Sequence, residues 1–484
     1  MEKKDLKPAS VFHYFEEVCQ VPRPSKKEEK IIAFLKAFGE KHGLATKSDA
    51  AGNVLISKPA TPGMENKKTI ILQSHIDMVC EKNSDVQHDF MNDPIETYID
   101  GEWLRAKGTT LGADNGIGVA TELAILAADD IAHGPIECLF TVDEETGLTG
   151  AFELKSGFMT GDILINLDSE DEGELFIGCA GGANTTAEFP MPLVEAPQNY
   201  FFFNVSVKGL TGGHSGDDIN KNRANANKLL VRFLTQLESN YPFYLCHIDG
   251  GNLHNAIPRE ASALCAVPMD AKEQIRIALN EFAADVENEF SVTEPNVKFA
   301  LSSEDAVAKA MDQQAAHNML RALYAVHNGV YAMSQDIPGL VETSSNLASI
   351  KEVNGKILVV TSQRSSILSQ RKDMSEMVSS AFLLGGATVS VGDGYPGWKP
   401  NTESPILKVS VESYKRLFGV EPKVKAIHAG LECGLFLEKY PSLDMVSFGP
   451  TLRGVHSPDE RMLIPTVDKF WRHLLDVLQN APAK

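Results

Sequence analysis

The sequence has none of the features that would tie it to a membrane or to nucleic acid. No stretch approaches the roughly 20 consecutive apolar residues of a membrane span, and the N-terminal stretch has no apolar core of signal-peptide length. Lys and Arg form no run longer than three, and the formal net charge is -20. Because an acidic chain repels polyanions, we expect neither nucleic-acid nor membrane partners.

Cysteine is too scarce and too scattered for a disulfide scaffold. The seven cysteines are odd in number, and no two are spaced as Cys-X-X-Cys. This usage predicts reduced thiols and a cytoplasmic location. The chain of 484 residues is 43% hydrophobic and 23% charged, which is ordinary for a globular protein of two or more domains.

Strands and helices alternate through the first third of the chain. The second N-terminal helix is expected to start at a capping box formed by Ser25 and Glu28 and to stop at Gly43. The expected elements are helices within 11–43 and at 114–128, and strands at 53–58, 69–77, 137–145 and 162–171. This alternation predicts an α/β fold, a mixed sheet flanked by helices, with ligands at the C-terminal ends of its strands.

The pattern changes after about residue 185 and returns near residue 405. Between two proline-rich connectors, at 189–197 and 394–405, lie further strands and two expected helices, at 219–239 and 373–384. Such a change is typical of an inserted α+β domain. The predicted domains are a discontinuous one, 1–185 with 396–484, and an inserted one, 186–395.

Acidic and imidazole side chains stand where the predicted strands end or a helix starts. In a strand, alternate residues point to the same face, so His75 and Asp77 should project side by side. The others are Asp114, Glu144, Glu145, Asp168 and, near the C-terminus, His456. A sheet can gather such ends, and because bunched carboxylates repel one another, a shared cation is the usual reason to gather them.

Imidazole and carboxylate ligands without thiolate suit Zn, Mn or Co. Two His, two Asp and one Glu suffice for two ions if one carboxylate bridges them. Asp77 would then hold the ring of His75 through its other nitrogen. The adjacent Glu144 and Glu145 point different ways, so one can bind metal while the other acts as general base.

Each of these motifs has a simpler interpretation when taken alone. His75 and Asp77 could be a surface pair, and Asp114 could be a helix N-cap. The run Asp143–Glu145 could be a solvated turn, and His456 could be structural or exposed. Their joint occurrence, each at a strand end or a helix start, favours the metal site.

The motifs SHIDMV, LGADNGIG, VDEETG, NLDSED and GVHSPDE, in this order, resemble the co-catalytic zinc exopeptidases, which include carboxypeptidase G, aminoacylase and dipeptidases. Over nearly the whole chain the sequence is most similar to the bacterial aminoacyl-histidine (Xaa-His) dipeptidases in that family. The phrases QVPRPSKKE, GTTLGADNGIG, FTVDEETGLTGA, GLTGGHSGDDI and GPTLRGVHSPDE carry this closer likeness.

The resemblance implies a role for each residue of the cluster. His75 and Asp168 would bind one zinc, and Glu145 and His456 the other, with Asp114 as the bridge. Asp77 would orient His75, and Glu144 would be the general base and later the acid. The resemblance also implies a cis peptide bond between Asp114 and Asn115.

In this family the inserted domain is a lid that binds substrate and often forms a homodimer. The resemblance implies that His214 stabilises the oxyanion, in its own site or a partner's, and that Asn255 lies near the substrate. It further implies that Arg364 receives the C-terminal carboxylate and that Gly430 offers backbone at the pocket wall. Alternatively, GLTGGHSG is only a glycine-rich turn and Arg364 a strand-edge charge. We assign no role to His254.

The expected activity is hydrolysis of small peptides by a dipeptidase with two divalent ions, zinc or otherwise Co or Mn. The expected substrates are Xaa-His dipeptides, including β-alanyl-histidine (carnosine). One alternative is an N-acyl amino-acid deacylase on the same scaffold. Another is a non-catalytic protein that binds metal or peptide, which predicts a missing base or ligand.

Overall fold

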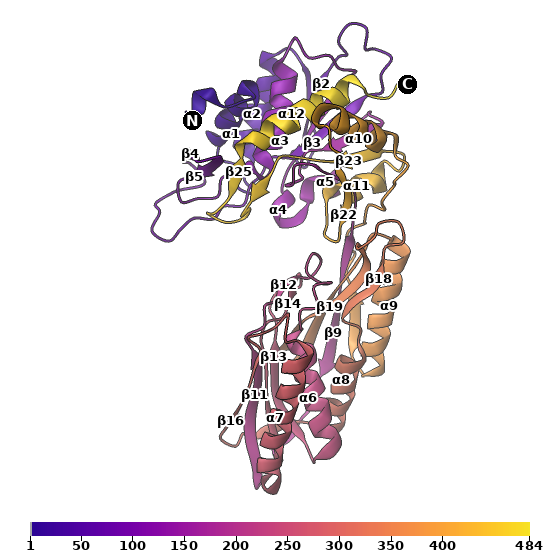
Figure 1. Ribbon diagram of the computed structural model, residues 1–484. Coiled ribbons are helices and arrows are strands. Elements are labelled where there is room, and N and C mark those ends of the chain that lie inside the picture. Colours follow the sequence, from indigo (N-terminus) through magenta and orange to yellow (C-terminus); the bar gives the residue numbers. More distant parts are fainter. Residues whose placement is uncertain (1) are drawn as a thin grey trace. The chain divides into compact units, whose positions relative to one another are not determined.

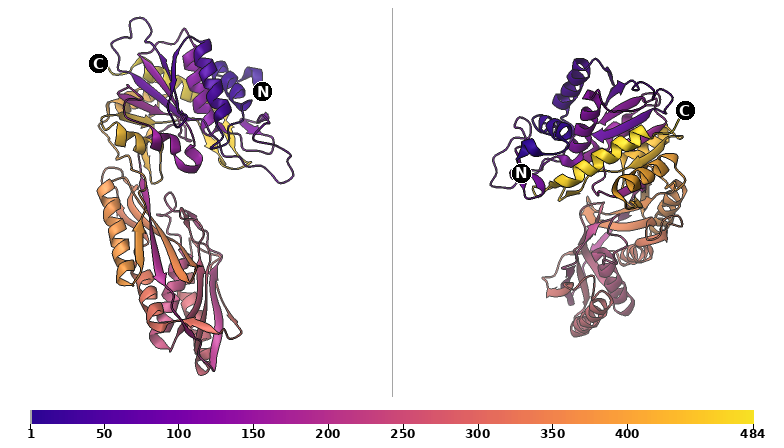
Figure 2. Two further views of the ribbon diagram at one scale, coloured as in Figure 1. Left: turned by 180° about the vertical axis from the view of Figure 1, so that it is seen from behind. Right: turned by 45° about the horizontal axis from the view of Figure 1, so that its top comes forward.

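The computed structural model describes residues 2–484, which form two compact units. Unit 1 contains the residues up to Gly178, Pro400–Ala426 and Leu431–Lys484, and unit 2 contains Cys179–Lys399 and Ile427–Gly430. Figure 1 draws the segments of unit 1 in indigo to purple and in yellow, and those of unit 2 in magenta to orange. Both chain ends belong to unit 1 (Figure 2).

Unit 1 is built on an eight-stranded mixed sheet. Its order is β1 (Ala45–Ser48), β2 (Val54–Lys58), β6 (Ile136–Thr141), β3 (Ile70–His75), β7 (Ile163–Asn166), β23 (Asp444–Ser447), β8 (Glu174–Cys179) and β22 (Lys423–Ile427). The central strand β3 is parallel to β6 and β7, and β23 is parallel to β7. All residues of β3, β6 and β7 are buried, so these strands form the core and end together at one edge.

Helices and a small second sheet complete unit 1. The helices are α1 (Ala9–Cys19), α2 (Glu29–Lys41), α3 (Ala113–Ala127), α4 (Glu144–Gly147), α5 (Thr149–Glu153), α10 (Pro405–Phe418), α11 (Glu432–Lys439) and α12 (Ile464–Gln479). The small sheet has the order β24 (Leu452–Arg453), β25 (Arg461–Leu463), β5 (Trp103–Ala106) and β4 (Thr97–Asp100). The predicted α/β class, a mixed sheet with flanking helices, is confirmed.

The predicted capping box of α2 is wrong. Ser25 does not cap the helix, which begins at Glu29; its hydroxyl donates instead to Asp77 Oδ2 at 2.7 Å. The Glu28 carboxylate accepts the backbone N–H of Lys26 at 2.9 Å and of Asp143 at 3.0 Å. Both side chains therefore serve contacts between segments that are far apart in sequence, which a local pattern does not reveal.

Unit 2 is an antiparallel nine-stranded sheet with helices. Its main order is β16 (Lys298–Ser303), β11 (Tyr200–Lys208), β15 (Ala261–Pro268), β13 (Tyr244–Gly250), β19 (Val341–Val353), β20 (Lys356–Ser365), β9 (Gly181–Pro190) and β21 (Thr388–Val391), and β18 (Gly329–Met333) pairs with β19. Its helices are α6 (Ala226–Asn240), α7 (Lys272–Glu289), α8 (Gln313–Ala325) and α9 (Leu368–Leu384). A two-stranded ribbon pairs β12 (Gly213–His214) with β14 (Ala256–Ile257).

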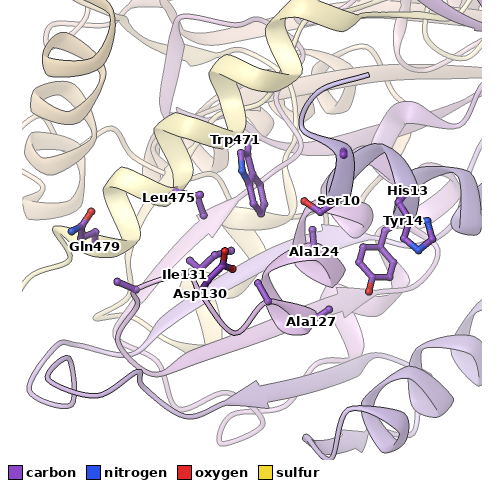
Figure 3. Close-up of a pocket in the computed structure, with 13 residues that line it drawn as sticks. Ser10, His13, Tyr14, Ala124, Ala127, Asp130, Ile131, Trp471, Leu475 and Gln479 are labelled. Carbon is purple, nitrogen blue, oxygen red and sulfur yellow. The ribbon is translucent and has the colours of Figure 1, made fainter. Parts of the chain in front are cut away.

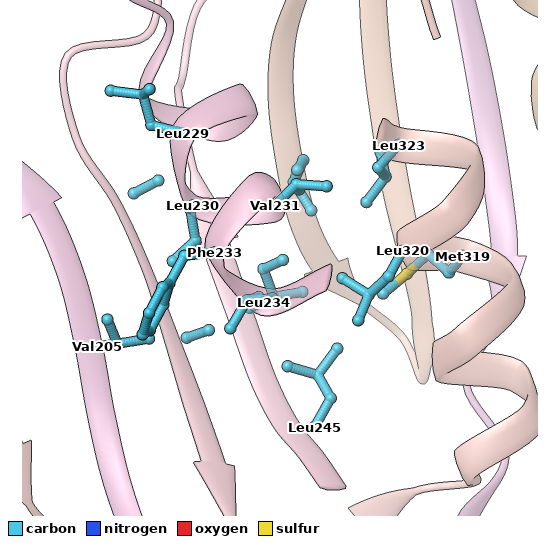
Figure 4. Close-up of a cluster of buried hydrophobic side chains, with 14 of the residues drawn as sticks. Val205, Leu229, Leu230, Val231, Phe233, Leu234, Leu245, Met319, Leu320 and Leu323 are labelled. Atoms are coloured by element: carbon cyan, nitrogen blue, oxygen red, sulfur yellow. The ribbon is translucent and has the colours of Figure 1, made fainter. Parts of the chain in front are cut away.

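The core of unit 2 forms where α6 packs on the sheet. Figure 4 shows Phe233 and Leu234 of α6 near Val205 of β11 and Leu245 of β13, and all four are buried. The helix was expected from residue 219, but it begins at Ala226 because the Asn225 side chain accepts the backbone N–H of Lys228 and caps it.

Residues 427–430 fall in unit 2 although the sequence grouped them with the other domain. The backbone N–H of Ala180 donates to the carbonyls of Ile427 at 3.1 Å and Ala429 at 2.9 Å. These bonds tie the segment to the start of β9. No helix among residues 2–484 combines the length and the apolar character needed to cross a bilayer.

A buried carboxylate of unit 2, Glu294, holds the loop that carries His214. It is 1% exposed and accepts the backbone N–H of Thr211 at 2.7 Å and of Ala224 at 3.0 Å. We expect Glu294→Ala to lower the free energy of unfolding by about 3 kcal/mol, because two buried donors lose a charged acceptor. Urea unfolding measures this effect. The exposed Glu287→Ala on α7 is the control and should change it little, and equal stability of the two variants would contradict the role given to Glu294.

Candidate metal centre and active site

The parallel strands of unit 1 bring the predicted site residues together at one edge of the sheet. His75 is the last residue of β3, Glu144 and Glu145 begin the short helix α4 after β6, and Asp168 follows β7. Asp114 lies in the first turn of α3. His456 lies in the turn between β24 and β25, with a φ of 61°.

Asp114 lies between the two histidines, one carboxylate oxygen toward each. His75 Nε2 is 3.0 Å from Asp114 Oδ1 and 3.3 Å from Asp168 Oδ1. His456 Nε2 is 3.2 Å from Asp114 Oδ2 and 2.9 Å from Glu145 Oε2. The side chain of His75 is 1% exposed and that of His456 52%. The contacts thus form two half-sites that share the Asp114 carboxylate. The first consists of His75 and Asp168, and the second of His456 and Glu145.

These donors fit metal ions. In a tetrahedral zinc site with bonds of about 2.0–2.1 Å, neighbouring ligand atoms lie about 3.3 Å apart, close to the separations around Asp114. Ligand atoms of His75, Asp114 and Glu145 all lie within 4.8 Å of one another. Burial, with the nearby Asp114 carboxylate, raises the pKa of Asp168 to about 6, and a cation would offset that cost. A second acidic group, Glu28, Asp77 and Asp143, adjoins the site.

Asp77 joins the first half-site to the two glutamates. The strand ends at His75, so Asp77 lies just beyond it, with Oδ1 3.3 Å from His75 Nδ1. The same carboxylate accepts the backbone N–H of Glu144 at 3.0 Å on Oδ1 and of Glu145 at 3.2 Å on Oδ2. Asp77 is fully buried. It therefore contacts the ring of His75 and holds the backbone of both glutamates at once.

The side chain of Glu144 lies among other acidic groups. Burial, and then the carboxylates of Asp168 and Glu432, raise the pKa of Glu144 well above its usual value. Glu432, fully buried at the start of α11, accepts hydrogen bonds from Gln73 at 2.6 Å and Thr141 at 2.9 Å. A carboxyl group in such surroundings can both take and return a proton.

Glu460 supports Asp114 and was not predicted. Its buried carboxylate accepts the backbone N–H groups of Leu111 at 2.7 Å, Gly112 at 2.9 Å, Ala113 at 2.8 Å and Asp114 at 3.3 Å. It thus satisfies the free N–H groups at the start of α3. The phrase GVHSPDE contains Glu460, but nothing local signals that its carboxylate reaches a helix 346 to 349 residues away in sequence.

Two further residues orient the site without having been predicted. Arg23 is 2% exposed and donates to the carbonyls of Ile76 at 3.2 Å and Asp77 at 2.8 Å. Asn115 donates to the carbonyl of Leu167 at 3.1 Å and to Asp168 Oδ1. The peptide bond between Asp114 and Asn115 is cis, as the resemblance implied.

The residues expected in the inserted domain lie in unit 2. His214 Nδ1 accepts the backbone N–H of Gly216 at 3.3 Å and of Asp217 at 3.2 Å. Arg364 on β20 is 6% exposed, and its Nη2 lies 3.4 Å from His214 Nε2. Asn255 is exposed in the turn before β14, and its carbonyl accepts the backbone N–H of Ser215.

Arg364 has unused hydrogen-bonding capacity. Within residues 2–484 its buried Nε has no hydrogen-bond partner. Its neighbour on β19, Ser344, contacts His428 Nε2 through its hydroxyl at 2.7 Å. Burial and the positive charge of Arg364 lower the pKa of His428 to about 3, so this ring is neutral. Burial and Arg364 also lower the pKa of His254, to which the structure adds no further role.

Gly430 lies beside Tyr395. A Cβ at this position would lie 2.8 Å from the ring of Tyr395, so the glycine makes room for that side chain. Elsewhere, Tyr14 of α1, Ala127 of α3 and Trp471 of α12 line a separate pocket of unit 1 (Figure 3). The described residues that line it include none of the candidate ligands.

We expect Glu460→Gln to weaken metal binding about 10- to 100-fold, because an amide cannot replace both carboxylate oxygens as acceptors for the loop that holds Asp114. Titration against a competing chelator measures the metal dissociation constant. The neighbouring Asp459, 83% exposed, gives the control Asp459→Asn, which should bind metal as the parent does. Unchanged metal affinity in Glu460→Gln would show that the loop does not depend on this carboxylate.

Full-length relatives share this sequence and fold. The chain is 42% identical over 483 residues to the cytosol non-specific dipeptidase of Escherichia coli strain K12, covering 100% of both chains. The crystal structure of aminoacylhistidine dipeptidase from Vibrio alginolyticus superposes with a TM-score of 0.93 at 44% identity, covering 100% of this chain and 99% of that one. A tripeptidase structure from Staphylococcus aureus, at 17% identity and a TM-score of 0.57 over 98% of each chain, shares the fold.

The family model described as Peptidase family M20/M25/M40 matches residues 71–480. This range contains every candidate ligand from His75 to His456 as well as the whole of unit 2. With the two relatives above 40% identity over the full length, it shows that the chain is a peptidase of family M20/M25/M40.

Proposed function

We propose that the protein is a dipeptidase with a dinuclear metal centre and that Xaa-His dipeptides, including β-alanyl-histidine (carnosine), are among its substrates. The observation that carries the proposal is the carboxylate of Asp114 shared between His75 and His456, each with a further carboxylate beside it. The names of the two full-length relatives, a non-specific dipeptidase and an aminoacylhistidine dipeptidase, support the substrate class.

Two divalent ions, zinc or otherwise Co or Mn, fit the nitrogen and oxygen donors of unit 1. His75 and Asp168 would hold one, Glu145 and His456 the other, and Asp114 both. When bound, such ions polarise the scissile carbonyl and lower the pKa of the attacking water.

Glu144 is the residue proposed to move protons. Its carboxyl group takes a proton from the attacking water and returns it to the leaving amine. Asp77 acts as the positioning residue, because it binds the backbone of Glu144 and contacts the ring of His75.

The proposed contacts of the substrate's polar groups come from unit 2. The imidazole of His214, with the Arg364 guanidinium 3.4 Å from its Nε2, suits an oxyanion, in the same chain or in a partner's site. Arg364, a buried charge whose Nε has no hydrogen-bond partner within residues 2–484, suits the C-terminal carboxylate. We keep Asn255 as a substrate contact because β14 follows it and pairs with the strand of His214. Gly430 contributes by leaving space for Tyr395.

The remaining expectations are part of the same proposal. A cytoplasmic location is supported by the E. coli relative, whose name places it in the cytosol. A homodimer through unit 2 would follow the family pattern that the sequence suggests. The net charge of -20 disfavours nucleic acid as a partner.

Two other functions remain in competition. An N-acyl amino-acid deacylase would use the same ligands and the same carboxylate receptor. The full-length relatives, both named dipeptidases, favour the dipeptidase. A non-catalytic binding protein would lack the base or a ligand, whereas Glu144 and all five ligand residues lie at the edge of the sheet.

The first test is release of free histidine from β-alanyl-histidine by zinc-loaded and by chelator-stripped protein. We expect release only with metal, and restoration when zinc, cobalt or manganese is added back. N-acetyl-histidine is the matched substrate for the deacylase, and its hydrolysis in preference to the dipeptide would favour that alternative. Release by protein shown to be metal-free would refute the metal mechanism.

The second test is Glu144→Gln, which keeps the size of the side chain but removes the base. We expect kcat to fall about 100- to 10,000-fold, with metal content unchanged because Glu144 is not proposed as a ligand. Glu153→Gln, on an exposed position of α5, is the control and should keep full activity. Near-parent turnover by Glu144→Gln at full metal occupancy would exclude this residue as the base.

A further inference from the structure

Arg364 has a hydroxyl partner in unit 2, the side chain of Tyr395. Its Nη1 donates to the hydroxyl oxygen of Tyr395 at 3.0 Å. Tyr395 exchanges backbone hydrogen bonds with Gly182 of β9, at 3.0 and 2.8 Å. Gly182 in turn lies opposite Arg364 in the β9–β20 pair. Gly182 thus lies between Tyr395 and Arg364 in the sheet. Because neighbouring strands lie about 5 Å apart, the tyrosine side chain must span two such spacings, about 10 Å, to reach the guanidinium.

Two glycines create the space that the tyrosine ring occupies. A Cβ at Gly182 would lie 2.8 Å from Cζ and the hydroxyl oxygen of Tyr395, and one at Gly430 would lie 2.8 Å from its Cε2. Neither glycine has a positive φ, so the backbone itself would accept another residue at both positions. Steric room for the Tyr395 ring is thus the reason for glycine at each.

The Tyr395 hydroxyl is left with a hydrogen to donate. Its oxygen accepts from Arg364, and within residues 2–484 no acceptor for its own O–H is found. Burial raises the pKa of Tyr395, so the hydroxyl keeps its proton. The buried Nε of Arg364 also has no partner in the described chain. The guanidinium and the hydroxyl are in contact, and each keeps a donor that an anionic group could use.

We propose that the Tyr395 hydroxyl and Arg364 together bind the C-terminal carboxylate of the substrate, and that Gly182 and Gly430 preserve the slot for the tyrosine. This inference rests on the proposed function of Arg364 as the carboxylate receptor. It makes Tyr395 a determinant of specificity, because peptides with an amidated C-terminus offer neither the negative charge nor the second acceptor oxygen.

The test compares Tyr395→Phe with the parent on β-alanyl-histidine and on its C-terminal amide. We expect KM for the free acid to rise about 10- to 100-fold, the loss expected for a hydrogen bond to a charged group, with kcat changed far less. The preference for acid over amide should shrink by a similar factor. Tyr331→Phe, which removes the same atom from a 45% exposed residue of β18, is the control and should leave both parameters unchanged.

A second variant tests the space for the Tyr395 ring separately from the Tyr395 hydroxyl. Gly430→Ala displaces the ring, so it should raise KM as Tyr395→Phe does, and the double variant should be no worse than either single variant. An additive effect would overturn the role given to Gly430. An unchanged KM and an unchanged acid preference in Tyr395→Phe would overturn the inference itself.

Calorimetry on the Glu144→Gln background distinguishes this inference from the proposed function. There, the affinity for β-alanyl-histidine should exceed that for its amide, and adding Tyr395→Phe should remove most of the difference. If the parent binds the dipeptide in this Tyr395-dependent way but hydrolyses no dipeptide, the proposed function fails and the inference stands. If dipeptides are hydrolysed but binding ignores Tyr395, the reverse holds.

Discussion

The contact of the Asp114 carboxylate with two histidines is the interaction on which the candidate site of unit 1 depends. One oxygen faces His75 and the other His456, residues that lie far apart in the sequence. A single carboxylate can serve both only if its backbone is held still. Glu460 provides this hold through the N–H groups ahead of α3, and Asn115 links the same turn to Asp168. Two buried polar side chains thus help to position the Asp114 carboxylate.

The sequence predicts those site residues that stand in a recognisable local pattern, and it misses those whose partners are distant in sequence. The ligands stand at strand ends or a helix start, and parallel strands end at one edge, so their meeting could be predicted. Glu460 and Arg23 act on backbone groups far away in sequence, which leaves no local pattern. Ser25 was misassigned for the same reason, because its hydroxyl serves Asp77 rather than a helix end. The role of Gly430 depends on Tyr395, which only the fold brings beside it.

The two units have different chemistry. The proposed metal ligands and the proposed base all lie in unit 1, where burial and the neighbouring Asp114 carboxylate raise the pKa of Asp168 to about 6. Unit 2 presents the opposite sign around Arg364, with a neutral His428 and the protonated Tyr395 nearby. A dipeptide carries both kinds of partner, since its scissile carbonyl suits a cationic centre and its terminal carboxylate a cationic side chain.

The unequal burial of the two histidines has a kinetic consequence. His75 is buried at the end of its strand, with 1% of its side chain exposed, whereas 52% of the His456 side chain is exposed. Solvent and chelators would therefore reach a metal ion held at His456 before one held at His75. Loss and reloading of metal would proceed one ion at a time, through a mononuclear enzyme that keeps the ion beside His75. A protein prepared in low metal would then be a mixture of occupancies with different activities.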